Sequence, residues 1–108
     1  MSHNLDIHPL NGNAPLLRVD KNAHEVSVSE RAVGLTAKEF ALLAYFVDHR
    51  GQAVSRSQLL EAVWGRSYSG SQRTVDIHVR RLRTKLGAAF DLVTLRGVGY
   101  RLGSAVAA

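Results

Sequence analysis

The sequence contains no cysteine, and this absence excludes a disulfide scaffold, thiol catalysis and zinc sites built on cysteine. Its longest apolar run, Phe40 to Val47, has eight residues, which is too short to cross a bilayer. No leader of charged, then apolar, then small residues opens the chain, so nothing in the sequence predicts export. We therefore expect a small soluble domain of the cytoplasm.

The usual patterns of metal and catalytic sites are also missing. The five histidines are scattered, and no two have the i, i+4 spacing of a helical metal site: His3, His8, His24, His49 and His78. No Ser/His/Asp set, phosphate-binding loop or carboxylate pair stands in a recognisable setting. We therefore expect no metal or other cofactor, and an enzyme is the least favoured class of function.

The sequence does contain enough apolar material for one core, together with an uneven charge. Of its 108 residues, 45% are hydrophobic and 21% are charged. The formal net charge is +5, and residues 71–108 account for it, with seven Lys or Arg against two Asp or Glu. Six of those seven are arginine, whose planar guanidinium matches phosphates and guanine edges. This excess predicts a surface that binds a polyanion; the alternative is a solvated basic helix face.

Apolar residues in the first third alternate with the period of half-buried strands. Three pairs predict strands: Leu5 and Ile7, Leu17 and Val19, and Val26 and Val28. Residues 32–35 suggest a further short strand, and residues 11–13 and 20–22 have turn composition. We expect a small antiparallel sheet of three or four strands.

From Thr36 onward the apolar spacing becomes helical. Two capping boxes, residues 36–39 and 55–58, predict the starts of two helices. The first is apolar on two sides, so we expect it to be sandwiched between the sheet and the later helices and to end at Gly51. The second follows a short extended step and ends at Gly65, and a polar loop leads to a third helix from about Ser71 to Leu86. Residues 92–102 predict a hairpin with a glycine-rich tip.

The third helix has two unlike faces. Four apolar residues fall in one narrow arc and predict a buried stripe: Val75, Val79, Leu82 and Leu86. Nearly opposite lie Arg73, Ile77, Arg80, Arg81 and Thr84. Thr74, His78 and Lys85 lie toward one flank, and Asp76 and Arg83 toward the other. Such a helix can dock on the core and present its remaining surface to a DNA major groove.

Two residues sharpen this hypothesis. Ile77 among arginines could pack on a thymine methyl group; alternatively the preceding loop covers it, or it is one exposed apolar residue. Arg96, at the tip of the hairpin, could enter a minor groove; alone, it would be an incidental surface arginine in a tight turn.

Several long motifs occur together in one order: Leu35-Thr36-Ala37-Lys38-Glu39-Phe40 with Leu42-Leu43, Ser55-Arg56 with Leu59-Leu60, Val63-Trp64-Gly65, residues 73–86, and Arg96 to Leu102. They resemble the OmpR/PhoB family of winged helix-turn-helix output domains of bacterial response regulators. The resemblance implies an α+β fold with an N-terminal antiparallel four-stranded sheet, three helices and a C-terminal β-hairpin wing. This domain would span residues 5–102, with residues 1–4 a leader or cloning remnant and residues 103–108 a flexible tail.

The resemblance also implies double-stranded DNA as partner, bound in direct repeats by head-to-tail pairs, and possible contact with RNA polymerase. The base-reading candidates are Thr74, Asp76, Ile77 and Arg81. The DNA-backbone candidates are Trp64, Arg73, His78, Arg80, Arg83, Thr94 and Tyr100, and Arg96 is the minor-groove candidate. The polymerase-contact candidates form the loop Gly65, Arg66, Ser67, Tyr68, Ser69 and Gly70. Family members usually carry a receiver domain with a phosphorylated aspartate, and we expect that this chain holds none.

Several roles stay open at this point. Asp76 could stabilise the helix dipole, accept from a cytosine amino group, or orient a nearby arginine. Trp64 could belong to the core while its indole N–H reaches a phosphate, and the hydroxyl of Tyr100 could face outward from a packed ring. We expect Lys38 and Arg101 to be surface charges. The competing function is a protein-interaction module that docks an acidic partner without DNA, against which the retained arginines argue.

Overall fold

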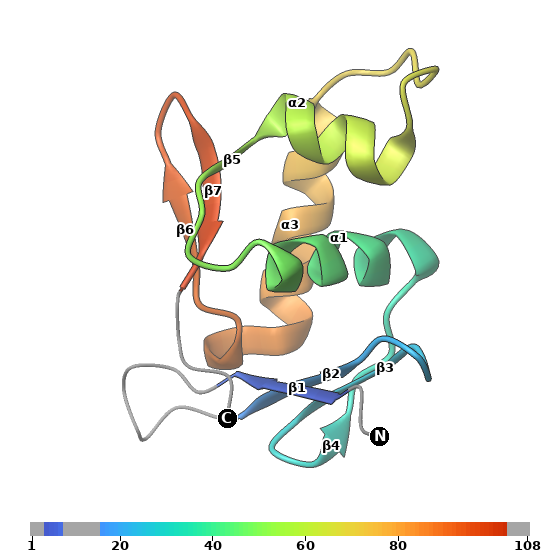
Figure 1. The fold of residues 1–108 in the computed structure, drawn as a ribbon, viewed down its shortest axis with the longest axis vertical. Coiled ribbons are helices and arrows are strands. Elements are labelled where there is room, and N and C mark those ends of the chain that lie inside the picture. The colour runs from blue at the N-terminus through green and yellow to red at the C-terminus, as the bar shows by residue number, and fades with distance from the viewer. Residues whose placement is uncertain (1–3, 8–15, 104–108) are drawn as a thin grey trace.

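The computed structural model describes residues 4–7 and 16–103, and it begins with a four-stranded antiparallel sheet (Figure 1). The strands are β1 (Asn4–Ile7), β2 (Leu17–Asp20), β3 (Glu25–Val28) and β4 (Arg31–Ala32), in that order across the sheet. Leu17, Val19 and Val26 are buried, so the predicted alternation is confirmed for β2 and β3. Asn22 and Ala23 both donate backbone N–H groups to the Asp20 carboxylate, which forms the predicted turn.

Two boundaries of this region differ from the prediction. Asn4 pairs with Asp20 within β1, so the predicted leader over residues 1–4 is one residue too long. The fourth strand covers Arg31–Ala32 rather than residues 32–35. Ser29 and Glu30 both have positive φ, and this tight turn starts the strand early. The predicted turn at residues 11–13 and residues 104–108 of the predicted tail lie outside the described residues, while Gly103, the first residue of that tail, donates its amide N–H to the Asp91 carbonyl.

Helix α1 (Ala37–Asp48) starts at the predicted capping box, with the Thr36 hydroxyl accepting from the Glu39 amide and the Glu39 carboxylate accepting from the Thr36 amide. Its buried residues include Leu42, Leu43, Phe46 and Val47, so the helix is covered on both sides as expected. It ends before Gly51, and the Arg50 guanidinium donates to the Val47 carbonyl in the last turn.

The second helical segment is irregular. Strand β5 (Val54–Ser55) leads into α2 (Arg56–Leu59), which the predicted Ser55–Gln58 capping box begins. The helix then widens into a π-helical stretch, η1 (Leu60–Trp64), and stops at Gly65 with φ of 96°. The spacing of apolar residues predicted the helix and its end, but not this change of pitch.

Helix α3 (Arg73–Leu86) begins two residues later than predicted. Residues 71 and 72 form a tighter turn, in which the Ser71 carbonyl accepts from the amide of Thr74. A short 3-10 turn, η2 (Gly87–Ala89), follows the helix and leads to the hairpin. The hairpin comprises β6 (Leu92–Leu95) and β7 (Gly99–Leu102), and β5 pairs with β7 to complete a three-stranded sheet. A Cβ on Gly99 would lie 2.0 Å from the Val54 carbonyl oxygen, so only glycine permits this close pairing.

The elements enclose one core around α1 and α3. In Figure 1, α1 crosses above the N-terminal sheet, α3 runs behind α1, and the β6–β7 wing stands beside α3. Side chains from the first sheet, the helices and the wing form one buried cluster, which includes Leu17, Phe46, Val79, Phe90 and Leu102. Within the described residues, no helix is long and apolar enough to span a membrane. The structure thus has the predicted winged-helix fold, with α3 and the wing side by side.

Candidate nucleic-acid interface

Helix α3 is anchored along the predicted stripe. Val75, Val79, Leu82 and Leu86 have exposed fractions of 0%, 1%, 0% and 3%. The burial of this one stripe fixes the rotation of the helix about its axis, because the residues between cannot turn inward without exposing it. The opposite face of α3 is therefore held toward solvent.

The outward face carries the predicted basic and apolar residues. The exposed residues are Arg73, Ile77, Arg80, Arg81 and Thr84. Ile77 is 44% exposed, which excludes the alternative that the preceding loop covers it. Together with Lys85, four of these residues line a shallow hollow of about 390 Å³: Ile77, Arg80, Arg81 and Thr84. Within the described residues, the guanidinium groups of Arg73, Arg80 and Arg81 form no hydrogen bond or ion pair, so their donors are available to another molecule.

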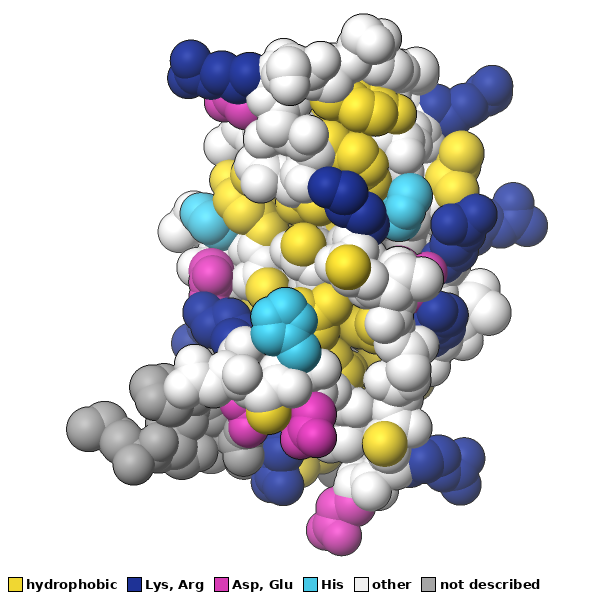
Figure 2. All heavy atoms as spheres, turned by 90° about the vertical axis from the view of Figure 1, so that its right-hand side faces the viewer, with side chains coloured by type: hydrophobic (Ala, Val, Ile, Leu, Met, Phe, Trp, Pro, Cys, Tyr) yellow, Lys and Arg dark blue, Asp and Glu magenta, His cyan; other side chains and the backbone are white. Residues whose placement is uncertain are grey.

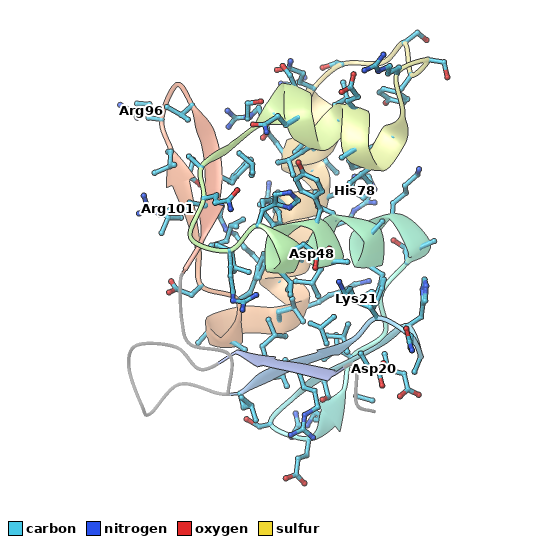
Figure 3. The ribbon with its side chains drawn as sticks, viewed as in Figure 1. Asp20, Lys21, Asp48, His78, Arg96 and Arg101 are labelled. Atoms are coloured by element: carbon cyan, nitrogen blue, oxygen red, sulfur yellow. The ribbon has the colours of Figure 1, made fainter. Side chains whose placement is uncertain are left out.

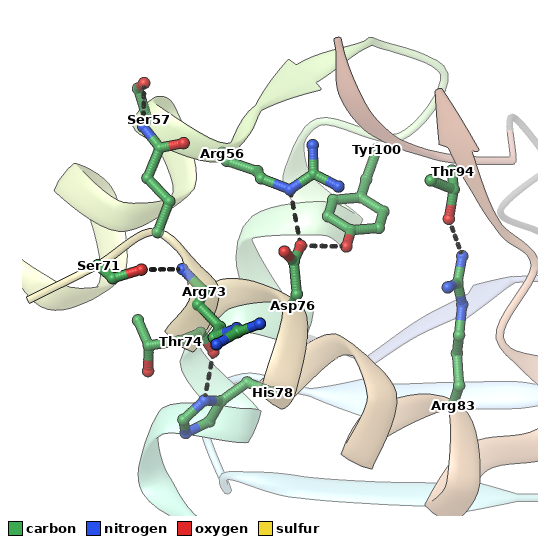
Figure 4. A network of polar contacts seen from close by, with 11 residues as sticks. Arg56, Ser57, Ser71, Arg73, Thr74, Asp76, His78, Arg83, Thr94 and Tyr100 are labelled. Atoms are coloured by element: carbon green, nitrogen blue, oxygen red, sulfur yellow. Dashed lines mark hydrogen bonds and ion pairs between the residues drawn. The ribbon is translucent and has the colours of Figure 1, made fainter. Parts of the chain in front are cut away.

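Asp76 is occupied inside the protein. Its Oδ1 accepts from Arg56 Nε at 2.7 Å and from the Tyr100 hydroxyl at 2.5 Å (Figure 4). Of the roles left open for Asp76, this geometry supports the one in which the carboxylate orients an arginine, and that arginine is Arg56. Tyr100 is 4% exposed, and its hydroxyl, which the sequence left free to face outward, donates to Asp76 instead. Arg56 was not among the predicted site residues, because its partners lie on other elements.

The charges around Asp76 also set its protonation. Burial would raise the pKa of Asp76, but the hydrogen bonds from Tyr100 and Arg56 and the positive charge of Arg56 outweigh it and lower the pKa. Burial and the neighbouring carboxylate raise the pKa of Tyr100. The pair is thus an ionised carboxylate and a neutral phenol at neutral pH.

Arg83 and Thr94, both predicted to contact the DNA backbone, contact each other. Arg83 Nη2 donates to Thr94 Oγ1 and to the Leu92 carbonyl, each at 2.9 Å. The Arg83 guanidinium also lies 5.7 Å from the centre of the Tyr100 ring. The arginine therefore joins α3 to the base of the wing, whereas its neighbours Arg80 and Arg81 point away.

A second group of side chains surrounds Trp64 at the end of η1. The Trp64 ring is half-buried against the core and meets the His78 ring edge-on at 4.9 Å. His78 Nδ1 lies 2.8 Å from the Thr74 carbonyl oxygen, which directs its Nε2 away from the helix backbone. Lys38 is exposed, as expected of a surface charge, and it also donates to the Val63 carbonyl at 2.9 Å and lies 5.7 Å from the Trp64 ring centre. These contacts hold the end of η1 against α1 and α3.

Lys85 forms an ion pair that sequence reasoning missed. Its Nζ lies 2.6 Å from Glu39 Oε1, and the Glu39 side chain is 1% exposed. The same oxygen accepts from the Thr36 amide, so one carboxylate caps α1 and neutralises the charge of Lys85 on α3. Burial would raise the pKa of Glu39, but the hydrogen bond and charge of Lys85 and the Thr36 amide outweigh it and lower the pKa. The capping box predicted only the first of these two roles.

The wing tip and the loop before α3 are exposed. Figure 3 shows Arg96 at the tip of the hairpin and Arg101 on its outer side, both directed away from the core. Val98, also at the tip, is 53% exposed. In the loop, Arg66 pairs with Glu61 at 2.9 Å, and the Tyr68 ring lies 6.4 Å from Trp64. Figure 2 shows the face of the molecule that lies on the right of Figure 1. Basic side chains stand out mostly around the edges of this face, and hydrophobic side chains lie along its middle.

These features can be compared with known proteins. Residues 30–102 match the family model described as "Transcriptional regulatory protein, C terminal". The sensory transduction protein RegX3 of Mycobacterium leprae is 46% identical over 92 residues, which cover 82% of this chain and 46% of that protein. The chain therefore spans less than half the length of this relative.

Solved structures agree with this match. The DNA-binding domain of Bacillus subtilis CssR is 43% identical, with a TM-score of 0.73 over 80% of this chain and 98% of that one. The DNA-binding domain of Klebsiella pneumoniae RstA, in complex with the RstA box, is 31% identical, with a TM-score of 0.72 over 81% of this chain and 90% of that one. The family match, the relatives and the winged fold agree, and the chain belongs to the OmpR/PhoB family of response-regulator DNA-binding domains.

Proposed function

We propose that this chain binds double-stranded DNA sequence-specifically and thereby regulates transcription in the cytoplasm. In the proposed complex α3 lies in the major groove and Arg96 enters the minor groove. The observation that carries the proposal is the outward face of α3, where three guanidinium groups that form no hydrogen bond or ion pair within the described residues surround an exposed isoleucine. On a solvated helix face the Ile77 side chain would have no apolar partner. A DNA groove offers phosphates to the arginines and thymine methyl groups to Ile77.

The residue roles follow from which donors are available. Thr74, Ile77 and Arg81 read base edges, while Arg73, Arg80, His78 and the indole of Trp64 contact phosphates. Asp76, Arg83, Thr94 and Tyr100 support the interface from within, because Asp76 Oδ1, Arg83 Nη2, Thr94 Oγ1 and the Tyr100 hydroxyl are already paired with one another or with Arg56 and Leu92. The loop from Gly65 to Gly70 is a proposed contact for RNA polymerase, and head-to-tail pairs on direct repeats are the proposed assembly.

Selection from a pool of random duplexes at a fixed salt concentration tests this function. We expect recovered duplexes to share a half-site that recurs in direct repeat, and we expect their affinity to fall as salt rises. Recovery of no duplex above scrambled competitor would contradict the proposal. Binding to an acidic polypeptide with no preference among duplexes would instead support the protein-interaction module.

A further inference from the structure

Three residues from three different elements meet at one carboxylate oxygen. Arg56 comes from α2, Asp76 from α3 and Tyr100 from β7, and we call this group the Asp76 junction (Figure 4). Arg56 makes two of the contacts, because its Nε donates to Asp76 and its guanidinium lies 5.0 Å from the centre of the Tyr100 ring. The junction thus joins the two helices of the helix-turn-helix to the wing.

The wing is attached to the helices through the core, where Tyr100 and Leu102 are buried and the Tyr100 and Phe46 rings meet edge-on, but within the described residues its polar attachments to the helices are few. A two-stranded hairpin is marginally stable alone, so its orientation depends on what it packs against. Strand β5 pairs with β7 at only two positions, Val54 with Tyr100 and Ser55 with Gly99. The bonds from Arg83 to Leu92 and Thr94 hold the β6 side of the hairpin. The Asp76 junction holds the β7 side, next to the tip that carries Arg96.

Charge makes the junction a stiff connection. The carboxylate of Asp76 is ionised, and hydrogen bonds to ionised groups are shorter and stronger than those between neutral groups. The geometry also has little freedom, since one oxygen receives a planar guanidinium and a phenol that is 4% exposed. Moving the wing relative to α3 would therefore break the hydrogen bond from Tyr100 to Asp76 and separate the Tyr100 ring from the Arg56 guanidinium.

We propose that Arg56 and the Asp76 junction are positioning residues that lock the wing to α3, so that Arg96 and Arg81 engage one duplex at a preset spacing. This inference rests on the proposed function and adds a role for Arg56, which the family resemblance contains in a motif but to which it assigned no role. Without the lock, the wing would have to be ordered during binding, and that cost would be subtracted from the contribution of Arg96.

The first test needs no DNA. Tyr100→Phe removes only the hydroxyl, and Arg56→Gln removes the guanidinium; Arg66→Ala, which loses an exposed pair, is the matched control. We expect amide hydrogen exchange in residues 93–101 to accelerate about tenfold or more in the first two variants, while amides of α1 and the control keep their rates. Unchanged wing exchange in both junction variants would overturn the proposal, whether or not the chain binds DNA.

The second test is a double-mutant cycle on a duplex recovered by the selection above. Arg96 and Tyr100 serve separate contacts, so Arg96→Ala should cost the same affinity in either background if the junction has only a general structural role. We expect Arg96→Ala to weaken binding about tenfold in the otherwise unchanged protein and only about twofold with Tyr100→Phe. Equal losses would overturn the proposal, while a chain that binds no duplex would contradict the proposed function and leave the exchange test to decide.

Discussion

The cationic side chains of α3 divide into two groups that differ in what holds them. Lys85 and Arg83 lie on the flanks and are bonded to Glu39 and to the wing, respectively. Arg73, Arg80 and Arg81 lie on the outward face and have no such bonds within the described residues. Arg81 and Arg83 are two residues apart, yet one points outward and the other joins the wing. The position of a basic residue around the helix, rather than its charge, thus decides whether it stabilises the fold or is available for a partner.

Removing a held cation should have the largest effect. We expect Lys85→Ala to lower the free energy of unfolding by about 2–4 kcal/mol, because it leaves the buried Glu39 carboxylate without its counter-charge. Denaturant unfolding measures this, and Arg80→Ala on the same helix is the control, with an expected change below about 0.5 kcal/mol. Equal, small losses in both variants would remove the distinction between the two groups.

Acid should weaken the same ion pair without any substitution. The folded-state pKa of Glu39 is lowered. The stability that Glu39 contributes is therefore present at pH values above the ordinary pKa of a glutamate, and it is lost as the pH falls through the folded-state pKa. We expect the unfolding free energy to decline from about pH 5 downward, and Glu39→Gln to decline less steeply. Part of the decline in unfolding free energy remains in Glu39→Gln, because the pKa of the Asp76 carboxyl is also lowered. Parallel pH profiles for the two proteins would contradict the assignment.

Arg81→Ala should leave the fold intact and weaken recognition. We expect a loss of about 1–3 kcal/mol on a selected duplex, together with a relaxed preference at one base position, because Arg81 is exposed and has no hydrogen-bond or ion-pair partner among the residues that the structure describes. Competition binding against single-base variants of the duplex measures both quantities. Arg101→Ala, on the outer side of the wing, is the control. A loss that is equal on every duplex would show that Arg81 does not read bases.

Local patterns in the sequence were sufficient for most of the fold. Both capping boxes started helices where predicted, because the side chain and the amide that bond are three residues apart. The buried stripe of α3 follows from spacing within one helix. The π-helical stretch Leu60–Trp64 was missed, since its altered pitch leaves the apolar pattern unchanged.

The candidate site was less predictable, because the partners of its residues come from distant parts of the chain. Lys85 and Glu39 are 46 residues apart, and Tyr100 and Asp76 are 24 apart. A helical wheel places Arg83 and Asp76 on one flank, but it cannot tell whether that flank faces solvent, DNA or the wing. The resemblance grouped Arg83 with the phosphate-contacting residues by matching the family motif, and in the folded structure Arg83 bonds to Leu92 and Thr94 whereas Arg80 is exposed.

Compared with Lys85→Ala, acidification and Arg81→Ala, Arg80→Ala should have the smallest effect. It distinguishes a phosphate contact from a base contact within the outward face of α3. Arg80 is exposed next to Arg81, but a phosphate contact carries no sequence information, so we expect binding to weaken almost equally on all duplexes. The slope of log affinity against log salt should become shallower by about one unit, because one fewer counterion is released. Affinities measured at several salt concentrations, with Arg81→Ala in parallel, decide the matter. An unchanged slope would remove Arg80 from the phosphate contacts and leave the electrostatic contribution of this face to Arg73 and Arg81.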